Sequence, residues 1–246
     1  MKEGGEEYGL DARHLEFEIE RLATNNSDYI SSVSHEMKTS ISTIKVFADL
    51  MLTEADPFDR DTSTQYLSII KAEADRLNHT VGRAADFYRF SQNICKWNEI
   101  KTDIADVIIR CVKAFQVLAE AKGIAFSVTK QANKMVVTID PERVQRLLWC
   151  LFENALKDTQ HGNIELTVGS EDVGTKTVLY ILMADTGVGI SADRMQKLRE
   201  SGVDCLGSEG EGLYVVGKIV DHYQGKLVID SQQDLGTSVC VELSLC

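Results

Sequence analysis

A short segment near residue 35 carries side chains that can take part in phosphoryl transfer. It reads SHEMKTS, so His35 stands beside Glu36, and Thr39 follows one helical turn later. Imidazole is partly neutral near pH 7, and a free ring nitrogen can attack phosphorus while a neighbouring carboxylate accepts the ring proton. The pattern alone also fits an ordinary exposed histidine, which stays open as the alternative.

Three segments of the C-terminal half have the composition of a nucleotide site. Asn154 and Lys157 share one face of a predicted helix, where an amide can ligate Mg²⁺ and an ammonium can meet phosphate. The segment DTGVGI, residues 185–190, starts with a carboxylate that can accept from an exocyclic amine, and its glycines allow the backbone to approach a ring. The segment GSEGEGL, residues 207–213, precedes a helix whose first N–H groups can bind phosphate. The two glycine-containing patterns also occur in ordinary turns and loops.

The N-terminal part predicts a helical hairpin that would position His35. One helix is predicted from Asp11 to about Thr53, a turn over 54–61, and a second helix from about Thr62 to Gln92. Each helix has one apolar stripe, and His35 points roughly 160° away from the stripe of its own helix. The stripes comprise Ile30, Val33, Met37, Ile41, Ile44, Ala48 and Met51, and then Tyr66, Ile70, Ala74, Leu77, Val81, Ala84 and Tyr88. Because one hairpin buries its stripes poorly, we expect a homodimer that forms a four-helix bundle.

Beyond Trp97 the pattern changes to alternating helices and strands. Helices are predicted from about Ile104 to Ala121, Pro141 to Thr159 and Tyr214 to Tyr223. Strands are predicted over 124–128, 135–139, 164–168, 177–183, 226–229 and 238–243. The fold class is therefore α+β with two domains, and the sheet of the second is covered by helices on one face. We divide the chain into an N-terminal linker or helix start (1–24), a helical domain (25–97) and an α+β domain (98–246).

Composition excludes some partners and compartments. A net charge of −12 argues against non-specific binding to nucleic acid or anionic membranes. The 6 cysteines form no CxxC pair. We therefore interpret them as small core residues of a protein in a reducing compartment. No signal peptide or long apolar span is present, so we expect a cytoplasmic chain or the cytoplasmic part of a larger, membrane-anchored protein.

Taken together, the motifs resemble those of the sensor histidine kinases of two-component systems. SHEMKTS is similar to their phosphoacceptor box, CLFENALKDT to their N box, DTGVGI to their first glycine box and GEGLYVVGKIV to their second. Gly236-Thr237-Ser238 matches their closing strand, and the resemblance covers nearly the whole chain from about Asn25. It implies a dimerising histidine-phosphotransfer hairpin followed by a GHKL-type (Bergerat) α/β sandwich that binds ATP and Mg²⁺.

The resemblance also implies roles for single residues. His35 would accept the γ-phosphoryl group of ATP and pass it to an aspartate of a response regulator. Glu36 and Thr39 match the family's E-x-x-T pattern, in which the acid assists phosphorylation and the threonine positions water for dephosphorylating the partner. The nucleotide site would comprise Asn154, which also holds Mg²⁺, together with Lys157, Asp185, Gly187, Gly189, Gly210, Gly212, Leu213 and Thr237.

Several positions depart from the family pattern and keep other functions open. Ser40 stands where the family has proline, and Cys150 replaces the first asparagine of the N box. The usual lid phenylalanines are absent between Ser191 and Gly207, and Glu211 adds negative charge near the expected phosphates. These departures favour, as an alternative, a degenerate kinase that acts as a phosphatase through Thr39, or as a dimerising scaffold with weak or no ATP binding.

A third hypothesis is a water-hydrolysing ATPase of the wider GHKL group. Those enzymes place a glutamate one turn before the N-box asparagine, where this chain has Cys150, a poor base for water. The hairpin would also have no role in such an enzyme. The sequence therefore predicts the catalytic core of a protein-histidine kinase.

Overall fold

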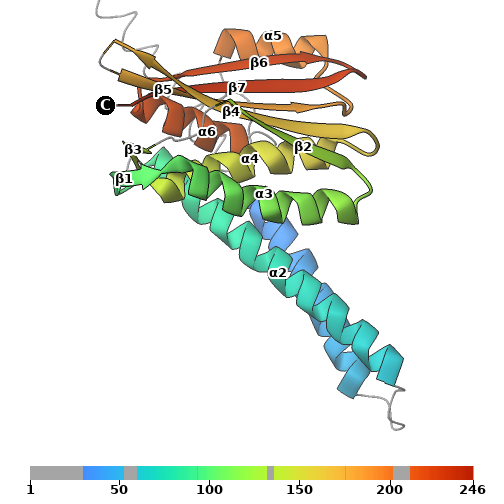
Figure 1. Cartoon of the computed structure of the whole chain (residues 1–246). Helices are drawn as coiled ribbons and strands as arrows, with labels where there is room; N and C mark the ends of the chain where they lie inside the picture. The colour runs from blue at the N-terminus through green and yellow to red at the C-terminus, as the bar shows by residue number, and fades with distance from the viewer. Residues whose placement is uncertain are drawn as a thin grey trace, which may run out of the picture. The chain divides into compact units, whose positions relative to one another are not determined.

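A computed structural model describes residues 30–52, 60–92, 94–131, 136–174, 176–201 and 211–245. They form two compact units, one reaching to Tyr88 and the other beginning at Arg89. Helix α2 (Arg60–Ser91) crosses this division (Figure 1). The predicted helix before residue 30, most of the turn with Pro57, and Gly210 lie outside the described residues.

The first unit is an antiparallel pair of helices, as the two apolar stripes predict. A helix over 30–52 lies beside α2 (Figure 1). The rings of Phe47 and Tyr66 lie 5.2 Å apart, whereas Glu36 contacts Arg83 at 2.9 Å. Late positions of the first helix therefore meet early positions of α2, and early positions meet late ones, which confirms the hairpin.

The hairpin leaves much of its apolar surface uncovered in the single chain. Four members of the predicted stripes, Ile30, Ile41, Val81 and Tyr88, are 62%, 50%, 45% and 60% exposed. By contrast Ser40, which replaces the family's proline, is buried within an uninterrupted helix. The serine therefore fills a packing position, and the helix keeps a hydrogen-bond donor there that a proline would remove.

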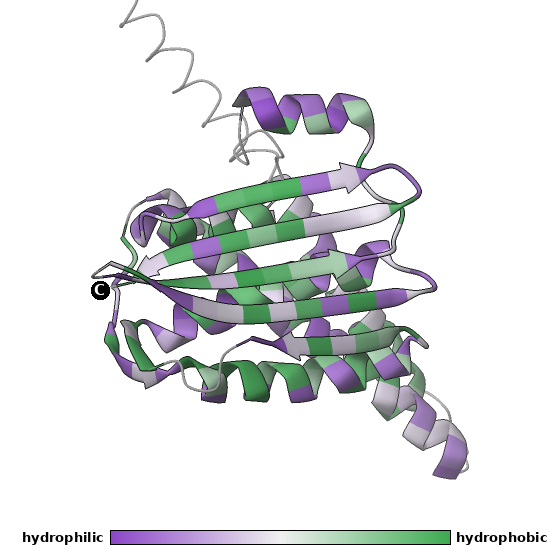
Figure 2. Ribbon diagram, turned by 45° about the horizontal axis from the view of Figure 1, so that its top comes forward, coloured by the Kyte–Doolittle hydropathy of each residue, from purple (hydrophilic) through white to green (hydrophobic). Residues whose placement is uncertain are grey.

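The second unit is a five-stranded sheet with helices on one face (Figures 1 and 2). The strand order is β2-β4-β5-β7-β6, with β2 parallel to β4 and every other pair antiparallel. The strands are β2 (Ala125–Lys130), β4 (Asn163–Val173), β5 (Lys176–Asp185), β6 (Lys226–Gln232) and β7 (Gly236–Leu245). The covering helices are α3 (Ile104–Ala121), α4 (Pro141–Asp158) and α6 (Glu211–His222). This arrangement confirms the predicted α+β class.

Burial of apolar side chains between sheet and helices holds this unit together. Alternate residues of β4 and β5 are buried, as the period of two dictates, among them Ile164, Leu166 and Ile181. Phe115 of α3 stacks on Phe152 of α4, with 4.0 Å between ring centroids. Each such side chain contributes about 1.5–3 kcal/mol by leaving water.

Two elements were not predicted from the sequence. Helix α5 (Ala192–Ser201) has only two buried apolar residues, Met195 and Leu198, so its helical period is weak. Strand β1 (Ile100–Asp103) is short and pairs with β3 (Val136–Ile139) in a separate two-stranded sheet. Both elements lie on the periphery of the fold, where few apolar positions mark them.

Residues just after α2 pack onto the second unit through Trp97. Its indole lies flat on the imidazole of His222, with 3.5 Å between ring centroids and 2° between ring planes. His222 Nε2 lies 2.8 Å from Glu99 Oε1, and the Arg143 guanidinium lies 5.9 Å from the centre of the Trp97 ring. The second unit thus takes in the chain from Arg89, whereas we expected the second domain from residue 98.

The end of this connection is tied to the start of α4. Asp140 is buried and caps α4, where its Oδ1 accepts from the backbone N–H groups of Glu142 and Arg143. Its Oδ2 accepts from Asn98 N at 2.8 Å, and its own N–H donates to the Tyr223 hydroxyl at 2.9 Å. Burial raises the pKa of Tyr223 to about 12. Asp140 therefore links the connection to α4 through its carboxylate, and to the residue after α6 through its backbone N–H.

The described residues contain no helix that is both long and apolar enough to cross a membrane. Of the cysteines in the described residues, Cys111 and Cys150 are buried, and Cys95 and Cys240 are half-buried. Burial raises the pKa of Cys111 to about 11, so this thiol stays protonated and packs as a small apolar group.

Candidate functional site

The helical hairpin presents His35 to solvent. The residue lies on the helix over 30–52 and is exposed, as its position opposite the apolar stripe predicts. Thr39 is also exposed, and its Oγ1 donates to the carbonyl oxygen of His35 at 3.0 Å. Because that bond uses the hydroxyl proton, the oxygen lone pairs remain available to accept from a water beside the imidazole.

Glu36 is held by the facing helix instead of projecting freely. Its Oε2 accepts from Arg83 Nη2 at 2.9 Å and from Thr80 Oγ1 at 3.4 Å. The Thr80 side chain is buried, so this carboxylate is bonded at the interface between the two helices. Sequence reasoning missed both partners, because each lies more than forty positions from Glu36 and no local pattern marks the pair.

In the second unit, Asn154 lies beside the start of α6. Asn154 is half-buried and Lys157 is exposed in the last turn of α4, so the two share a face as predicted. A Cβ on Gly212 would lie 3.5 Å from Asn154 Nδ2 and 3.6 Å from its Oδ1. The glycine therefore keeps the space beside this amide open, next to the first N–H groups of α6. Leu213, the next residue, is buried.

Asp185 ends β5 and closes a tight turn. Its Oδ1 accepts from Gly187 N at 2.8 Å. Burial raises the pKa of the carboxyl above its ordinary value of 3.8, opposed by backbone hydrogen bonds from Gly187 and Thr237 and reinforced by the nearby charge of Asp158. A half-buried carboxylate with one oxygen fixed by a backbone amide is suited to accept from a donor on a ligand.

The turn after Asp185 requires its glycines. A Cβ on Gly187 would lie 2.5 Å from the carbonyl oxygen of Asp158, at the end of α4. Gly189 has φ +65°, and a methyl group there would overlap the carbonyl oxygen of Gln232 in β6. The predicted glycine box is thus packed between the end of α4 and the end of β6.

Ser231, which sequence reasoning missed, joins this turn to β7. Its Oγ accepts from Ile190 N at 2.8 Å and donates to Gly236 O at 3.0 Å. The same oxygen lies 2.9 Å from Thr237 Oγ1, and Thr237 pairs with Asp185 across β5 and β7. One hydroxyl therefore fixes both Thr237 and the end of the glycine turn.

The predicted site residues fall into two groups. His35, Glu36 and Thr39 lie in the first unit, and Asn154, Lys157, Asp185, Gly187, Gly189, Gly212, Leu213 and Thr237 lie in the second. The structure brings Asn154 together with Gly212, and Asp185 together with Gly187 and Thr237. Among the described residues no cluster of three or more His, Cys, Asp or Glu side chains is placed to hold a metal ion.

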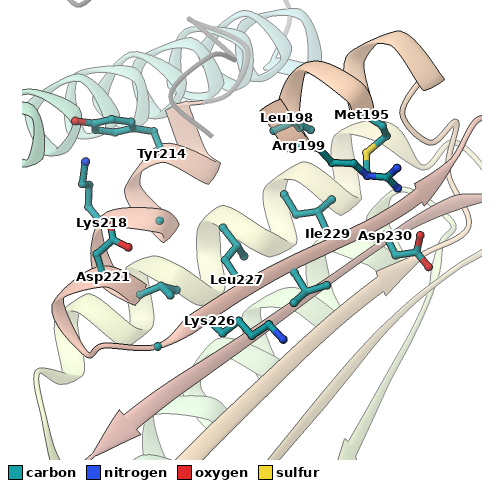
Figure 3. A pocket seen from close by; sticks show the side chains of 14 residues that line it. Met195, Leu198, Arg199, Tyr214, Lys218, Asp221, Lys226, Leu227, Ile229 and Asp230 are labelled. Atoms are coloured by element: carbon teal, nitrogen blue, oxygen red, sulfur yellow. The ribbon is translucent and has the colours of Figure 1, made fainter. Parts of the chain in front are cut away.

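A cavity of about 880 Å³ lies elsewhere in the second unit, between α5, α6 and β6 (Figure 3). Met195, Leu198 and Ile229 supply apolar lining, and Lys218 lies 5.1 Å from the centre of the Tyr214 ring. None of the predicted site residues lines it. The face of α6 that borders this cavity is also not the face that meets Asn154, so the two regions are distinct.

Comparison with protein families finds two matching models. Residues 25–93 match the His Kinase A (phospho-acceptor) domain, and residues 139–246 match the family described as histidine kinase-, DNA gyrase B-, and HSP90-like ATPase. The first match contains the segment with His35. The second contains every residue predicted for the nucleotide site, from Asn154 to Thr237.

Curated relatives cover nearly all of this chain. It is 25% identical over 236 residues to the autoinducer 2 sensor kinase/phosphatase LuxQ of Vibrio parahaemolyticus, covering 92% of this chain and 27% of that protein. It is 25% identical over 243 residues to the histidine protein kinase DivJ of Caulobacter vibrioides, covering 96% of this chain and 40% of that protein. The chain therefore spans less than half the length of these relatives.

Solved structures share the fold. The histidine kinase AdeS of Acinetobacter baumannii superposes with a TM-score of 0.62 at 20% identity, covering 86% of this chain and 98% of that one. Full-length ShkA in complex with AMPPNP gives a TM-score of 0.61 at 17% identity, covering 89% and 46%. The histidine kinase ThkA in complex with the response regulator TrrA gives 0.59 at 19% identity, covering 100% and 68%.

Proposed function

Because this chain belongs to the sensor histidine kinases of two-component systems, we propose that His35 accepts the γ-phosphoryl group of ATP and then donates it to an aspartate of a response regulator. The observation that carries the proposal is the exposed His35 on a helix of the phospho-acceptor hairpin, in the same chain as a unit with the ATPase fold. Of the hypotheses above, only a kinase uses both units.

The second unit binds the nucleotide in this proposal. Asp185 accepts from the adenine amino group through the carboxylate oxygen that Gly187 leaves available. Asn154 and Lys157 face the phosphates, together with the first N–H groups of α6. Support comes from the space that Gly212 keeps open beside the Asn154 amide.

The donor set fits Mg²⁺ held mainly by the substrate. Asn154 offers one amide oxygen, and the described residues supply no carboxylate cluster around it. Mg²⁺ keeps several waters and is commonly held by one or two protein groups plus substrate phosphates, and when bound it neutralises the phosphate charge. Asn154 therefore serves as the protein's ligand, and Lys157 adds a second positive group beside the phosphates.

At His35 the chain supplies the nucleophile and its base. One ring nitrogen attacks the γ-phosphorus, the bond to the ADP oxygen breaks, and the second ring nitrogen gives its proton to Glu36. The product phosphoramidate is a good donor, so transfer to an aspartate depends mainly on docking and in-line placement. ThkA was solved with a response regulator, which supports a receiver domain as the partner here.

A second copy of the chain completes the hairpin in this proposal. Ile30, Ile41, Val81 and Tyr88 expose apolar surface along both helices of one hairpin, and pairing two hairpins into a four-helix bundle would cover it. Sedimentation of the whole chain should therefore give a dimer. A monomer at micromolar concentration would contradict this part of the proposal.

Thr39 supports dephosphorylation of the partner as a second activity. Its hydroxyl is exposed one turn from His35 and has lone pairs available for a water. The relative LuxQ is named a sensor kinase/phosphatase. A phosphorylated receiver domain should lose its phosphoryl group faster with the wild-type chain than with the Thr39→Ala variant.

Incubation with radiolabelled ATP and Mg²⁺ tests the kinase. We expect an acid-labile, alkali-stable label on the wild type and on the control variant His79→Gln, and none on His35→Gln or Asn154→Ala, with the dimer intact in all four. An unlabelled wild type would favour the degenerate kinase, and steady ATP turnover by His35→Gln would favour a hydrolytic ATPase.

A further inference from the structure

The carboxylate next to His35 is bonded across the hairpin to α2. Glu36 Oε2 accepts from Arg83 Nη2 at 2.9 Å and from Thr80 Oγ1 at 3.4 Å. Thr80 and Arg83 lie three positions apart, so they share one face of α2. Among the described residues, both hydrogen bonds to this carboxylate fall on Oε2. The other oxygen, Oε1, is therefore the one that can take a proton.

The surroundings of this pair are partly buried. The Arg83 and Glu36 side chains are 27% and 38% exposed, and Thr80 is 3% exposed. Such a half-buried, charge-assisted hydrogen bond holds its acceptor in one orientation, whereas a solvent-exposed pair of long side chains does not. An otherwise flexible glutamate is thereby fixed beside the proposed nucleophile.

We propose that Arg83, assisted by Thr80, is a positioning residue for phosphorylation of His35. In the step, a ring nitrogen forms the bond to phosphorus, and the electron pair of the broken bond leaves on ADP. The proton of the imidazole passes to Glu36 Oε1, while Oε2 stays bonded to Arg83. Arg83 acts through Glu36, because its hydrogen bond to Oε2 aims the base. This inference rests on the proposed function and deepens it.

A freely rotating Glu36 side chain predicts a different phosphorylation rate for a variant that lacks Arg83. If the carboxylate rotated freely, loss of Arg83 would change the phosphorylation rate no more than loss of another arginine of α2. Arg76 is the matched control, since it lies on the same helix and its ion pair among the described residues is with the neighbouring Glu73, at 3.7 Å. The comparison therefore separates aiming of the base from a general effect of removing positive charge.

The test is a double-mutant cycle on the whole dimeric chain, scored as the rate constant of autophosphorylation at saturating ATP. We expect Glu36→Gln to lower the rate about 100-fold, which is the scale of a lost general base. Arg83→Ala should lower it about tenfold with the KM for ATP unchanged. The double variant should be no slower than Glu36→Gln alone, because Arg83 acts only through Glu36.

Two further variants guard against simple misfolding. Arg83→Lys keeps a cation that can reach Oε2 and should recover at least half of the lost rate, and Arg76→Ala should match the wild type. Thermal melting and sedimentation of each variant report on fold and dimer. Equal rates for Arg83→Ala and Arg76→Ala, or effects of Glu36→Gln and Arg83→Ala that multiply in the double variant, would overturn the inference alone. A wild type without label on His35 would overturn the proposed function as well.

Discussion

Replacing Asp185 by asparagine should separate nucleotide recognition from fold stability. In the structure Oδ1 accepts from Gly187 N at 2.8 Å, and in the proposed site the second carboxylate oxygen accepts from the adenine amino group. An asparagine that keeps the bond to Gly187 must present its Nδ2, a donor, at that place. A donor then meets the donor of the adenine amino group, and the hydrogen bond is lost.

The size of the effect follows from the type of bond. A hydrogen bond to a charged group is worth about 1.5–3 kcal/mol, which corresponds to an increase of about 10- to 150-fold in the Kd for ATP. The free energy of unfolding should increase in this variant, whereas the affinity for ATP should fall. Since burial raises the pKa of Asp185, the folded state binds its proton more tightly than the unfolded state.

The sign of the stability change sets its pH dependence. For a raised carboxyl pKa, stability is greatest below the ordinary value of 3.8 and falls as the pH rises through the folded value. Because asparagine does not titrate, the Asp185→Asn variant does not lose this stability as the pH rises. The free energy of unfolding of Asp185→Asn, relative to the wild type, should therefore increase as the pH is raised from 3.8 to 7.

Calorimetric titration with a non-hydrolysable ATP analogue and denaturant unfolding at several pH values measure the two effects. Asp230→Asn is the matched control, since Asp230 is an exposed carboxylate of β6 in the same sheet. A folded Asp185→Asn variant with unchanged affinity would refute the assignment of this carboxylate to the adenine. If the difference in the free energy of unfolding between Asp185→Asn and the wild type did not change with pH, the raised pKa of Asp185 would be refuted.

Three further substitutions test other parts of the structure. Gly212→Ala should leave thermal stability unchanged, because its nearest contacts lie at 3.5 Å or more, but should weaken ATP binding about tenfold by filling the space beside Asn154, as titration would show. Trp97→Ala should lower the free energy of unfolding by about 2–3 kcal/mol through loss of the stack on His222, and a loss below 0.5 kcal/mol by denaturant titration would contradict this. Thr39→Ala removes only an exposed hydrogen bond, so stability should change by less than about 0.5 kcal/mol and autophosphorylation should persist, whereas dephosphorylation of the receiver domain should slow.

Local patterns in the sequence predicted most of the fold. The apolar stripes predicted the helical pair, and Pro141 predicted the start of α4, because periodicity and the preference of proline for a first helical turn act over a few residues. The same reasoning missed α5, whose two buried apolar residues Met195 and Leu198 make too weak a period. It also missed β1, which has a single apolar residue at its start.

The contacts that hold the site residues in place join residues far apart in the sequence, which local patterns cannot predict. Arg83 meets Glu36, and Trp97 stacks on His222, only because the tertiary fold brings distant segments together. Ser231 likewise connects strand ends that no local pattern relates. The motifs therefore predicted which residues carry the chemistry, but not the residues that hold them in place.

The central claim is that His35 receives the phosphoryl group, and mass spectrometry at neutral pH tests it most directly. After incubation of the wild-type chain with ATP and Mg²⁺, fragmentation of the peptide that contains residues 34–40 should place one phosphoryl group on His35. A phosphoryl group on another residue, or unmodified His35 in a chain shown to bind ATP, would contradict the account.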